Sequence, residues 1–190
     1  MDRRTRVITF ALTAVLSGTL AALAAALLLP YAVRTPATLV RISGDVQLVQ
    51  PHQRPQPVTP EDAARARLSA GDSLMLAPRS TATIVLDLCA GRIFLEGPLT
   101  FTLVESAQRA TLAGHLGASN RFARDYTLIL EQSGGTASYV FSDASPPLAS
   151  IALTVRLADA SFTPSLPCWS VVFSADGTPT LREHDCAPPA

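Results

Sequence analysis

Residues 80–103 read STATIVLDLCAGRIFLEGPLTFTL. Apolar residues recur there at every second position, first from Ala82 to Leu88 and again from Leu99 to Leu103. A period of two places successive side chains on opposite faces of a β-strand, so each run predicts a strand with one buried face and one wet face. Gly97-Pro98 lies between the runs and predicts a turn.

The same alternation continues through most of the chain after about residue 35. The core-facing positions are expected to be Val40, Ile42, Val46 and Leu48; Tyr126, Leu128 and Leu130; Ile151, Leu153, Val155 and Leu157; and Trp169, Val171 and Phe173. Further turns are expected at Ala90-Gly91, Ser133-Gly134-Gly135, Ser145-Pro146-Pro147 and Asp176-Gly177. Short strands separated by regular turns favour an all-β sandwich or barrel-like fold.

Three stretches depart from this pattern. Thr59 followed by Pro60 predicts the start of a short helix, because threonine caps helices and proline suits the first turn. Residues 106–122 are rich in alanine and glycine and are expected to form a long connection. Residues 35–38 are expected to be a short tether to the segment that precedes them.

That preceding segment is apolar. Residues 7–33 carry no charge. A helix needs about 20 apolar residues to cross the hydrocarbon layer, so this segment is long enough to span a membrane. Three arginines precede it and only Arg34 follows closely, so the positive-inside rule places the N-terminus in the cytoplasm. We therefore expect a single-pass cell-membrane protein with a cytoplasmic stub at 1–6, an anchor at 7–33 and an extracytoplasmic β domain at 34–190.

A cleaved signal peptide is the alternative interpretation of this segment. Signal peptides have an apolar region of about 7–15 residues followed by small residues at a cleavage site. The apolar run here is longer, and Tyr31-Ala32-Val33 is a poor cleavage signal. The uncleaved anchor is the preferred interpretation, and either one predicts export of the domain.

The charge composition bears on the kinds of partner. The chain has a formal net charge of zero, with 15 positive and 15 negative side chains and no lysine. Nucleic-acid binding usually requires a basic face, so nucleic acid is not expected as a partner. No phosphate-binding loop or dinucleotide fingerprint is present, so no cofactor and no small-molecule substrate are expected.

The chain has three cysteines, and exported proteins meet conditions that permit disulfides. Cys168 and Cys186 flank a predicted hairpin that turns at Asp176-Gly177. If the loop centres on Gly177, the two cysteines lie opposite each other, at a spacing that a disulfide can bridge. We therefore predict a Cys168–Cys186 disulfide. Cys89 is left over, either as a small buried residue or as a reactive thiol.

The sequence offers no assembled catalytic set. A sortase-like reaction would pair Cys186 with His115, but the arginine that follows the cysteine in sortases is missing. A metal site at His184 and Cys186 would need further ligands, and Asp185 would point to the opposite strand face. His52 is distant in sequence from both. We expect a non-enzymatic protein.

The chain contains five short motifs with glycines or small residues at their turns: Ile42-Ser43-Gly44-Asp45-Val46; Leu68-Ser69-Ala70-Gly71-Asp72-Ser73-Leu74; the run from Ser80 to Asp87 with Ile93-Phe94-Leu95 after it; Leu130-Glu131-Gln132-Ser133-Gly134-Gly135-Thr136-Ala137; and Asp176-Gly177-Thr178. Their arrangement resembles the FecR-like domain of bacterial envelope proteins. The resemblance is best over residues 40–103 and looser over 128–180. The chain departs from the family's pattern at two places. The usual Asp-Gly turn is replaced by Leu88-Cys89-Ala90-Gly91. The Gly-Thr that precedes the penultimate strand in the family is absent, and Pro167-Cys168 lies near that position.

The resemblance implies a membrane-tethered module that binds or senses a partner. Iron-uptake regulators of this type hold a sigma factor with a sizeable cytoplasmic domain, whereas only six residues precede the apolar run here. We therefore expect a binding, sensing or scaffolding module whose partner is an envelope protein or polymer. A structural component of envelope assembly is the alternative, and an enzyme with an unrecognised site is a further one.

Overall fold

The computed structural model describes residues 15–25, 30–89, 91–111, 126–141, 151–157, 160–183 and 186. Its contacts divide the chain into two compact units. The first comprises Met1–Ala32 and Arg109–Arg124, and the second comprises Val33–Gln108 and Asp125–Ala190.

The first unit contains a helix at residues 15–25, inside the segment predicted to be the anchor. Its apolar side chains are exposed, and Leu20 retains 68% of its accessible surface. No helix in the described part of the chain is both long and apolar enough to span a membrane. Residues 7–14 and 26–29 of the predicted anchor, and the whole predicted stub, lie outside the described residues.

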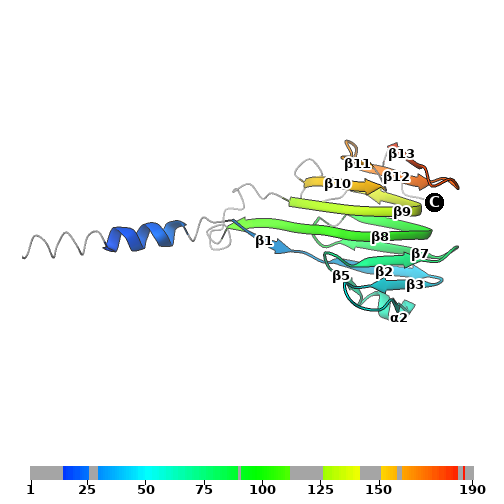
Figure 1. The fold of residues 1–190 in the computed structure, drawn as a ribbon, viewed down its shortest axis with the longest axis horizontal. Coiled ribbons are helices and arrows are strands. Elements are labelled where there is room, and N and C mark those ends of the chain that lie inside the picture. Colours follow the sequence, from blue (N-terminus) through cyan, green and yellow to red (C-terminus); the bar gives the residue numbers. More distant parts are fainter. Residues whose placement is uncertain are drawn as a thin grey trace, which may run out of the picture. The chain divides into compact units, whose positions relative to one another are not determined.

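The second unit is mostly β-structure, as the alternation predicts. Its elements begin at the junction of the units with β1 (Pro30–Arg34) and continue with β2 (Ala37–Ser43), β3 (Val46–Val49), β4 (Gln56–Pro57), α2 (Pro60–Ala63), β5 (Arg67–Leu68), β6 (Ser73–Leu76), β7 (Thr81–Leu86), β8 (Arg92–Thr111), β9 (Tyr126–Val140), β10 (Ile151–Leu157), β11 (Ala160–Phe162), β12 (Cys168–Phe173) and β13 (Pro179–Glu183). Figure 1 shows the two longest strands, β8 and β9, side by side.

These strands form one curled, 13-stranded sheet in which most neighbours are antiparallel and β10 runs parallel to β9. The curl arises because each long strand has different neighbours along its two halves. Residues 92–96 of β8 pair with β7, whereas residues 99–102 pair with β6. Likewise, residues 136–140 of β9 pair with β12, and residues 126–132 pair with β10.

The sheet therefore has two halves. The β7 half-sheet comprises β5, β2, β7, the first part of β8, the last part of β9, β12 and β13. The β6 half-sheet comprises β4, β3, β6, β1, the later part of β8, the first part of β9, β10 and β11.

The change of partners takes place where the sequence predicts two turns, and both of these predictions are wrong. Gly97-Pro98 lies inside β8, joined by a cis peptide bond, and Gly134-Gly135 lies opposite it inside β9. The pairing register shifts between Glu96 and Leu99. Both glycines of β9 have positive φ, which allows the backbone to bulge within a continuing strand. Turn-forming residues here bend a pair of strands without ending them.

Both half-sheets bury side chains in a single hydrophobic core. The alternation predicted for β9, β10 and β12 is confirmed, since Leu128, Leu153 and Val171 are all buried. Val40 is an exception, because it is 51% exposed whereas Leu39 is fully buried. The register of β2 against β7 shifts between Leu39 and Arg41, so a bulge at Val40 interrupts the alternation.

The structure confirms one local prediction and corrects two others. The short helix is confirmed as α2, with the backbone N–H of Asp62 donating to the Thr59 hydroxyl. Residues 106–111 of the predicted connection belong instead to β8, and residues 112–122 lie outside the described part of the chain. The tether is shorter than predicted because β2 begins at Ala37, and the Thr35 N–H already donates to the Ser106 carbonyl at 3.0 Å.

Candidate functional site

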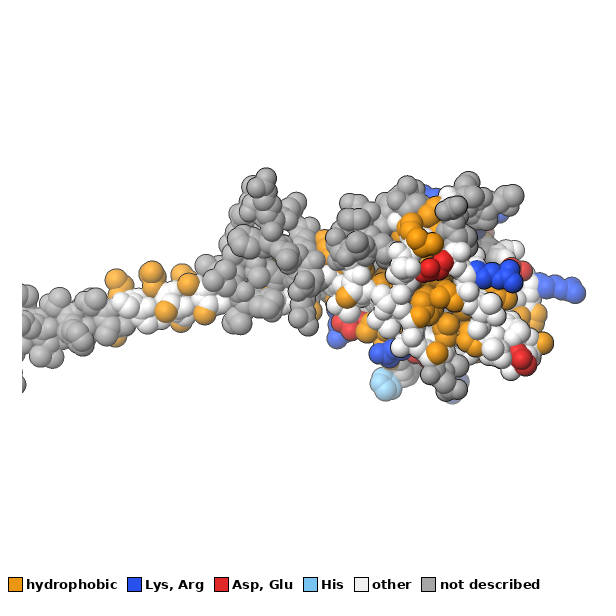
Figure 2. Space-filling model, turned by 90° about the horizontal axis from the view of Figure 1, so that it is seen from above, with side chains coloured by type: hydrophobic (Ala, Val, Ile, Leu, Met, Phe, Trp, Pro, Cys, Tyr) orange, Lys and Arg blue, Asp and Glu red, His pale blue; other side chains and the backbone are white. Residues whose placement is uncertain are grey.

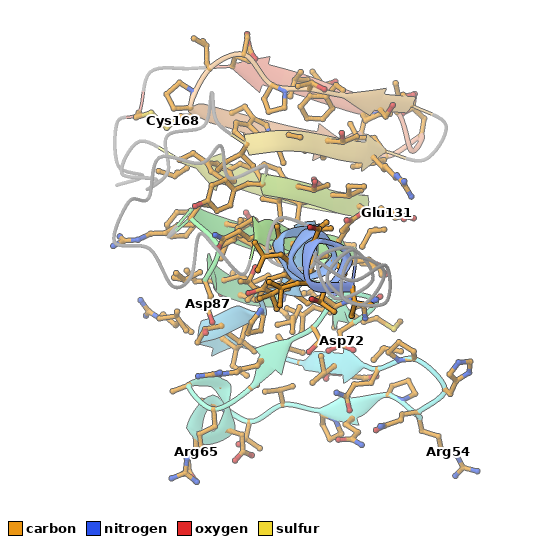
Figure 3. The ribbon with its side chains drawn as sticks, turned by 90° about the vertical axis from the view of Figure 1, so that its left-hand side faces the viewer. Arg54, Arg65, Asp72, Asp87, Glu131 and Cys168 are labelled. Atoms are coloured by element: carbon orange, nitrogen blue, oxygen red, sulfur yellow. A yellow bond between two sulfur atoms is a disulfide. The ribbon has the colours of Figure 1, made fainter. Side chains whose placement is uncertain are left out.

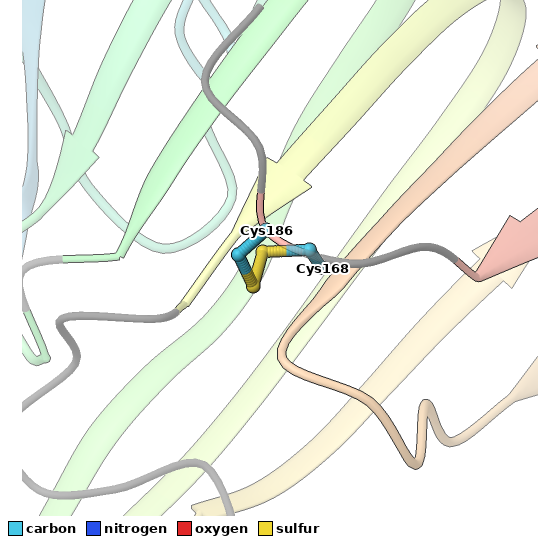
Figure 4. Close-up of a disulfide and its surroundings, with 2 residues drawn as sticks. All are labelled: Cys168 and Cys186. Atoms are coloured by element: carbon cyan, nitrogen blue, oxygen red, sulfur yellow. A yellow bond between two sulfur atoms is a disulfide. The ribbon is translucent and has the colours of Figure 1, made fainter.

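The predicted disulfide between Cys168 and Cys186 is present, with 5.3 Å between the two Cα atoms. It joins the first residue of β12 to the chain just after β13 (Figure 4). The register that led to this prediction is wrong by two residues, because Phe173 pairs with Pro179 and Trp169 with Glu183. The hairpin therefore centres on Asp176 instead of Gly177. A shift of two residues keeps each side chain on the same face of the strand, so the pairing of the cysteines survives the error.

Polar contacts hold the same hairpin at both of its ends. At the turn, the Asp176 carboxylate accepts hydrogen bonds from the hydroxyl of Ser174 and from the N–H of Thr178. These two hydrogen bonds, the first above all, lower the pKa of Asp176. At the open end, the Glu183 carboxylate accepts hydrogen bonds from the backbone N–H and the hydroxyl of Ser165, both at 3.0 Å. The hydrogen bond from the Ser165 backbone is the main reason that the pKa of Glu183 is lowered. Both carboxylates thus stabilise the C-terminal hairpin.

Cys89 is a free cysteine with a fully buried side chain. Burial raises the pKa of its thiol, although a hydrogen bond with the backbone of Gly91 acts in the opposite direction. Reactive cysteines are exposed and have a lowered pKa, so this environment is that of a core residue.

Of the other residues considered for chemistry, the structure describes only His52 and Cys186. His52 is exposed in a turn with a φ of 63°, and His115, His184 and Asp185 lie outside the described residues. Cys186, the nucleophile of the sortase-like alternative, has its sulfur bonded to Cys168. No group of three or more metal-ligating side chains occurs in the part of the chain that the structure describes.

One of the glycine motifs behind the FecR-like resemblance, the one around Gly71, forms a turn that is hydrogen-bonded to β8. Gly71 has a φ of 96°, and its N–H donates to the Leu103 carbonyl at 2.7 Å. The buried carboxylate of Asp72 accepts a hydrogen bond from the N–H of Ser69 at 2.8 Å. These contacts assign the Gly71-Asp72 pair a structural role, in closing the loop between β5 and β6.

Sequence reasoning missed a buried polar cluster at the bend of the sheet. The Tyr139 hydroxyl donates to Gln132 Oε1 at 3.0 Å, and Gln132 Nε2 donates to the Gly134 carbonyl at 3.2 Å. The Trp169 ring stacks on Tyr139 and Phe141 with centroid distances of 4.9 and 5.1 Å. The position of Gln132, two residues after Leu130 in an alternating strand, was the available signal. The hydrogen bonds of Tyr139 and Gln132 are all internal, so these two side chains stabilise the core, whereas the buried Trp169 Nε1 has no hydrogen-bond partner among the described residues.

The outward-facing surfaces of the two half-sheets differ in charge. We call the outer surface of the β7 half-sheet the arginine face. Among the described residues, its exposed charged side chains are Arg41, Arg67, Arg92, Arg182, Asp87 and Glu96. The described strands of the β6 half-sheet carry the exposed charged residues Arg34, Arg156, Glu105 and Glu131. The chain has no net charge overall, yet the arginine face is net basic whereas these four charges balance.

A second surface feature lies at the end of the domain formed by β11, β12 and β13. Leu166, Val172 and Leu181 are 42%, 37% and 40% exposed there. Figure 2 views the molecule from this side and shows hydrophobic side chains bordered by charged ones. Figure 3 shows Cys168 at this end, whereas Arg54 and Arg65 project at the other.

Comparisons with protein-family models, curated protein sequences and solved structures find no match for this chain.

Proposed function

We propose that this protein is a non-enzymatic binding module of the cell envelope, held to the membrane by its N-terminal segment. Its β domain, facing away from the cytoplasm, would bind or sense an envelope protein or polymer. The observation that carries the proposal is the Cys168–Cys186 disulfide, which joins the start of β12 to the chain just after β13. Such bonds persist in oxidising compartments and are rare in the cytosol.

The architecture of the second unit also supports a binding role. A curled sheet with a single core is a rigid support, and rigid supports commonly present loops and edge strands for recognition. In the described chain β13 pairs only with β12, so its other side is an edge. The loop residue Leu166 and the edge residue Leu181 both expose apolar side chains beside it.

Photo-crosslinking in cells tests this proposal on the full-length chain. A photoreactive amino acid is placed at Leu166 or at Leu181, and adducts are identified by mass spectrometry. Glu61 in α2, which is exposed at the other end of the domain, is the matched control position. We expect one envelope protein or polymer to be recovered reproducibly from Leu166 and Leu181 and not from Glu61. Recovery of only abundant membrane proteins from all three positions would contradict the proposal.

A further inference from the structure

We propose that the arginine face binds a linear acidic polysaccharide. This inference rests on the proposed function and deepens it by naming the chemical class of the partner. One row of side chains crosses the whole half-sheet. The row consists of Arg41, Thr83, Phe94, Ser138, Ser170 and Arg182, each paired with the next across neighbouring strands.

The backbone fixes the length of this row. Neighbouring strands lie about 4.8 Å apart, so the steps from β2 through β7, β8, β9 and β12 to β13 span about 24 Å between Arg41 and Arg182. The two arginines at its ends are exposed, and the four residues between them are half-buried. The row is thus a linear track suited to an extended chain instead of a compact ligand.

The residue types along the track match the chemistry of an acidic sugar polymer. The half-buried ring of Phe94, near the middle, presents an apolar surface on which the C–H face of a sugar ring can pack. Thr83 and Ser138 flank it with hydroxyl groups that can both donate and accept hydrogen bonds. The terminal guanidinium groups suit carboxylates, which arginine binds through two parallel N–H donors.

Charge complementarity favours an anionic polymer over a neutral one. Four exposed arginines on this face oppose two carboxylates, whereas the described strands of the β6 half-sheet carry two arginines and two glutamates. Glu96 lies on the same face of β8 as Phe94, two residues further along the strand. An anionic chain on the track would therefore be attracted by Arg41 and Arg182 and repelled by Glu96.

An anionic lipid surface fits the arginine face less well. Binding to a bilayer surface relies on large apolar side chains that insert, or on a dense run of basic residues. The track has a half-buried phenylalanine and hydroxyl groups at its centre, and its basic residues stand at the two ends. This arrangement favours contact along a polymer.

The experiment uses the full-length chain in a nonionic detergent, in native gels that contain increasing concentrations of polygalacturonate. Dextran, a neutral polysaccharide, replaces it in the control gels. We expect polygalacturonate to retard the protein, dextran to leave its mobility unchanged, and added salt to weaken the retardation. Flotation with preformed vesicles tests whether the anionic groups come from a lipid instead. Phosphatidylglycerol vesicles are compared with neutral phosphatidylcholine vesicles, which account for insertion of the N-terminal segment, and a soluble fragment of polygalacturonate is the competitor.

Matched substitutions then assign the binding to the arginine face. The double variant R41Q/R182Q is expected to bind about five- to tenfold more weakly, because each exposed charge contributes modestly. F94A is expected to weaken binding, and E96Q to strengthen it. On the β6 half-sheet, R156Q and E131Q are the corresponding controls and should bind like the wild type. Equal thermal unfolding midpoints for all variants show that the fold is retained.

Three results would overturn the inference. The first is no retardation of the wild-type protein by polygalacturonate at low salt. The second is an equal effect of R156Q and of R41Q/R182Q. The third is a stronger flotation with phosphatidylglycerol vesicles than with phosphatidylcholine vesicles that R41Q/R182Q abolishes and soluble polygalacturonate does not compete. If any of these occurs while crosslinking at Leu166 and Leu181 still recovers an envelope partner, the polysaccharide assignment fails and the binding module stands.

Discussion

Gly135 lies against the backbone of Glu96, at the point where β8 and β9 exchange partners. A Cβ atom placed on Gly135 would fall 2.5 Å from the Glu96 carbonyl oxygen, and the residue has a φ of 58°. The neighbouring strand therefore excludes a side chain here, and the backbone conformation disfavours one as well. The bend that divides the sheet into its two halves depends on this close approach.

The first prediction concerns this contact. Gly135→Ala should lower the free energy of unfolding by about 3 kcal/mol, through positive-φ strain together with the clash against the Glu96 carbonyl. Gly177→Ala is the matched control, because Gly177 has a φ of 83° but no atom within 4 Å of the added Cβ. It should cost only about 1 kcal/mol. Equal losses for the two variants in urea denaturation would show that the clash is unimportant.

The bulge in β2 leads to a second prediction. Leu39→Ala should destabilise the protein by about 2–5 kcal/mol, because the Leu39 side chain is fully buried. Val40→Ala should change stability by less than about 0.5 kcal/mol, because Val40 is 51% exposed. Chemical denaturation of the two adjacent variants checks this. An uninterrupted alternation in which Val40 and Ile42 face the core would instead give a large loss at Val40.

The disulfide gives a third prediction. Its two cysteines are separated by 18 positions, and closing a loop of this length contributes about 3 kcal/mol in the chain-entropy model. Replacing both cysteines by serine should lower the free energy of unfolding by about that amount. The reductant dithiothreitol should destabilise the wild type similarly and leave the double variant unchanged. A Cys89→Ala variant that keeps the full sensitivity to reductant would confirm that Cys89 takes no part.

In cells, the same disulfide reports on the compartment. A thiol-reactive polyethylene glycol should not label Cys168 or Cys186 in the denatured, unreduced protein, and should label both after reduction. Acid quenching at lysis keeps free thiols protonated, which prevents later oxidation from producing this pattern. Full labelling without reductant would contradict export of the domain.

Tyr139 makes stability dependent on pH in the alkaline range. Burial raises the pKa of its phenol in the folded state, whereas an unfolded tyrosine ionises near pH 10. The folded state therefore binds more protons above that pH, and its stability falls as pH rises. Tyr139→Phe should show a shallower loss of stability between about pH 9 and pH 11. At pH 7 it should be less stable by about 1 kcal/mol, since the hydrogen bond to Gln132 is lost. An unchanged alkaline slope would show that another group is responsible.

Much of the fold follows from local patterns in the sequence. The alternation of apolar and polar residues specifies which faces of β9, β10 and β12 are buried, because a strand has a period of two whatever its neighbours. The Thr59-Pro60 pair specifies the start of α2 for an equally local reason. The pairing of Cys168 with Cys186 also followed, although the hairpin register was wrong by two residues.

Tertiary structure alone decided where strands continue and which surfaces face outward together. Gly97-Pro98 and Gly134-Gly135 have the composition of turns, and only their mutual position across β8 and β9 makes them a bend within two long strands. The row from Arg41 to Arg182 joins residues far apart in the chain, so no periodicity along the sequence reveals it. Local propensity acts through neighbours along the chain, whereas pairing between strands depends on contacts that only the folded sheet creates.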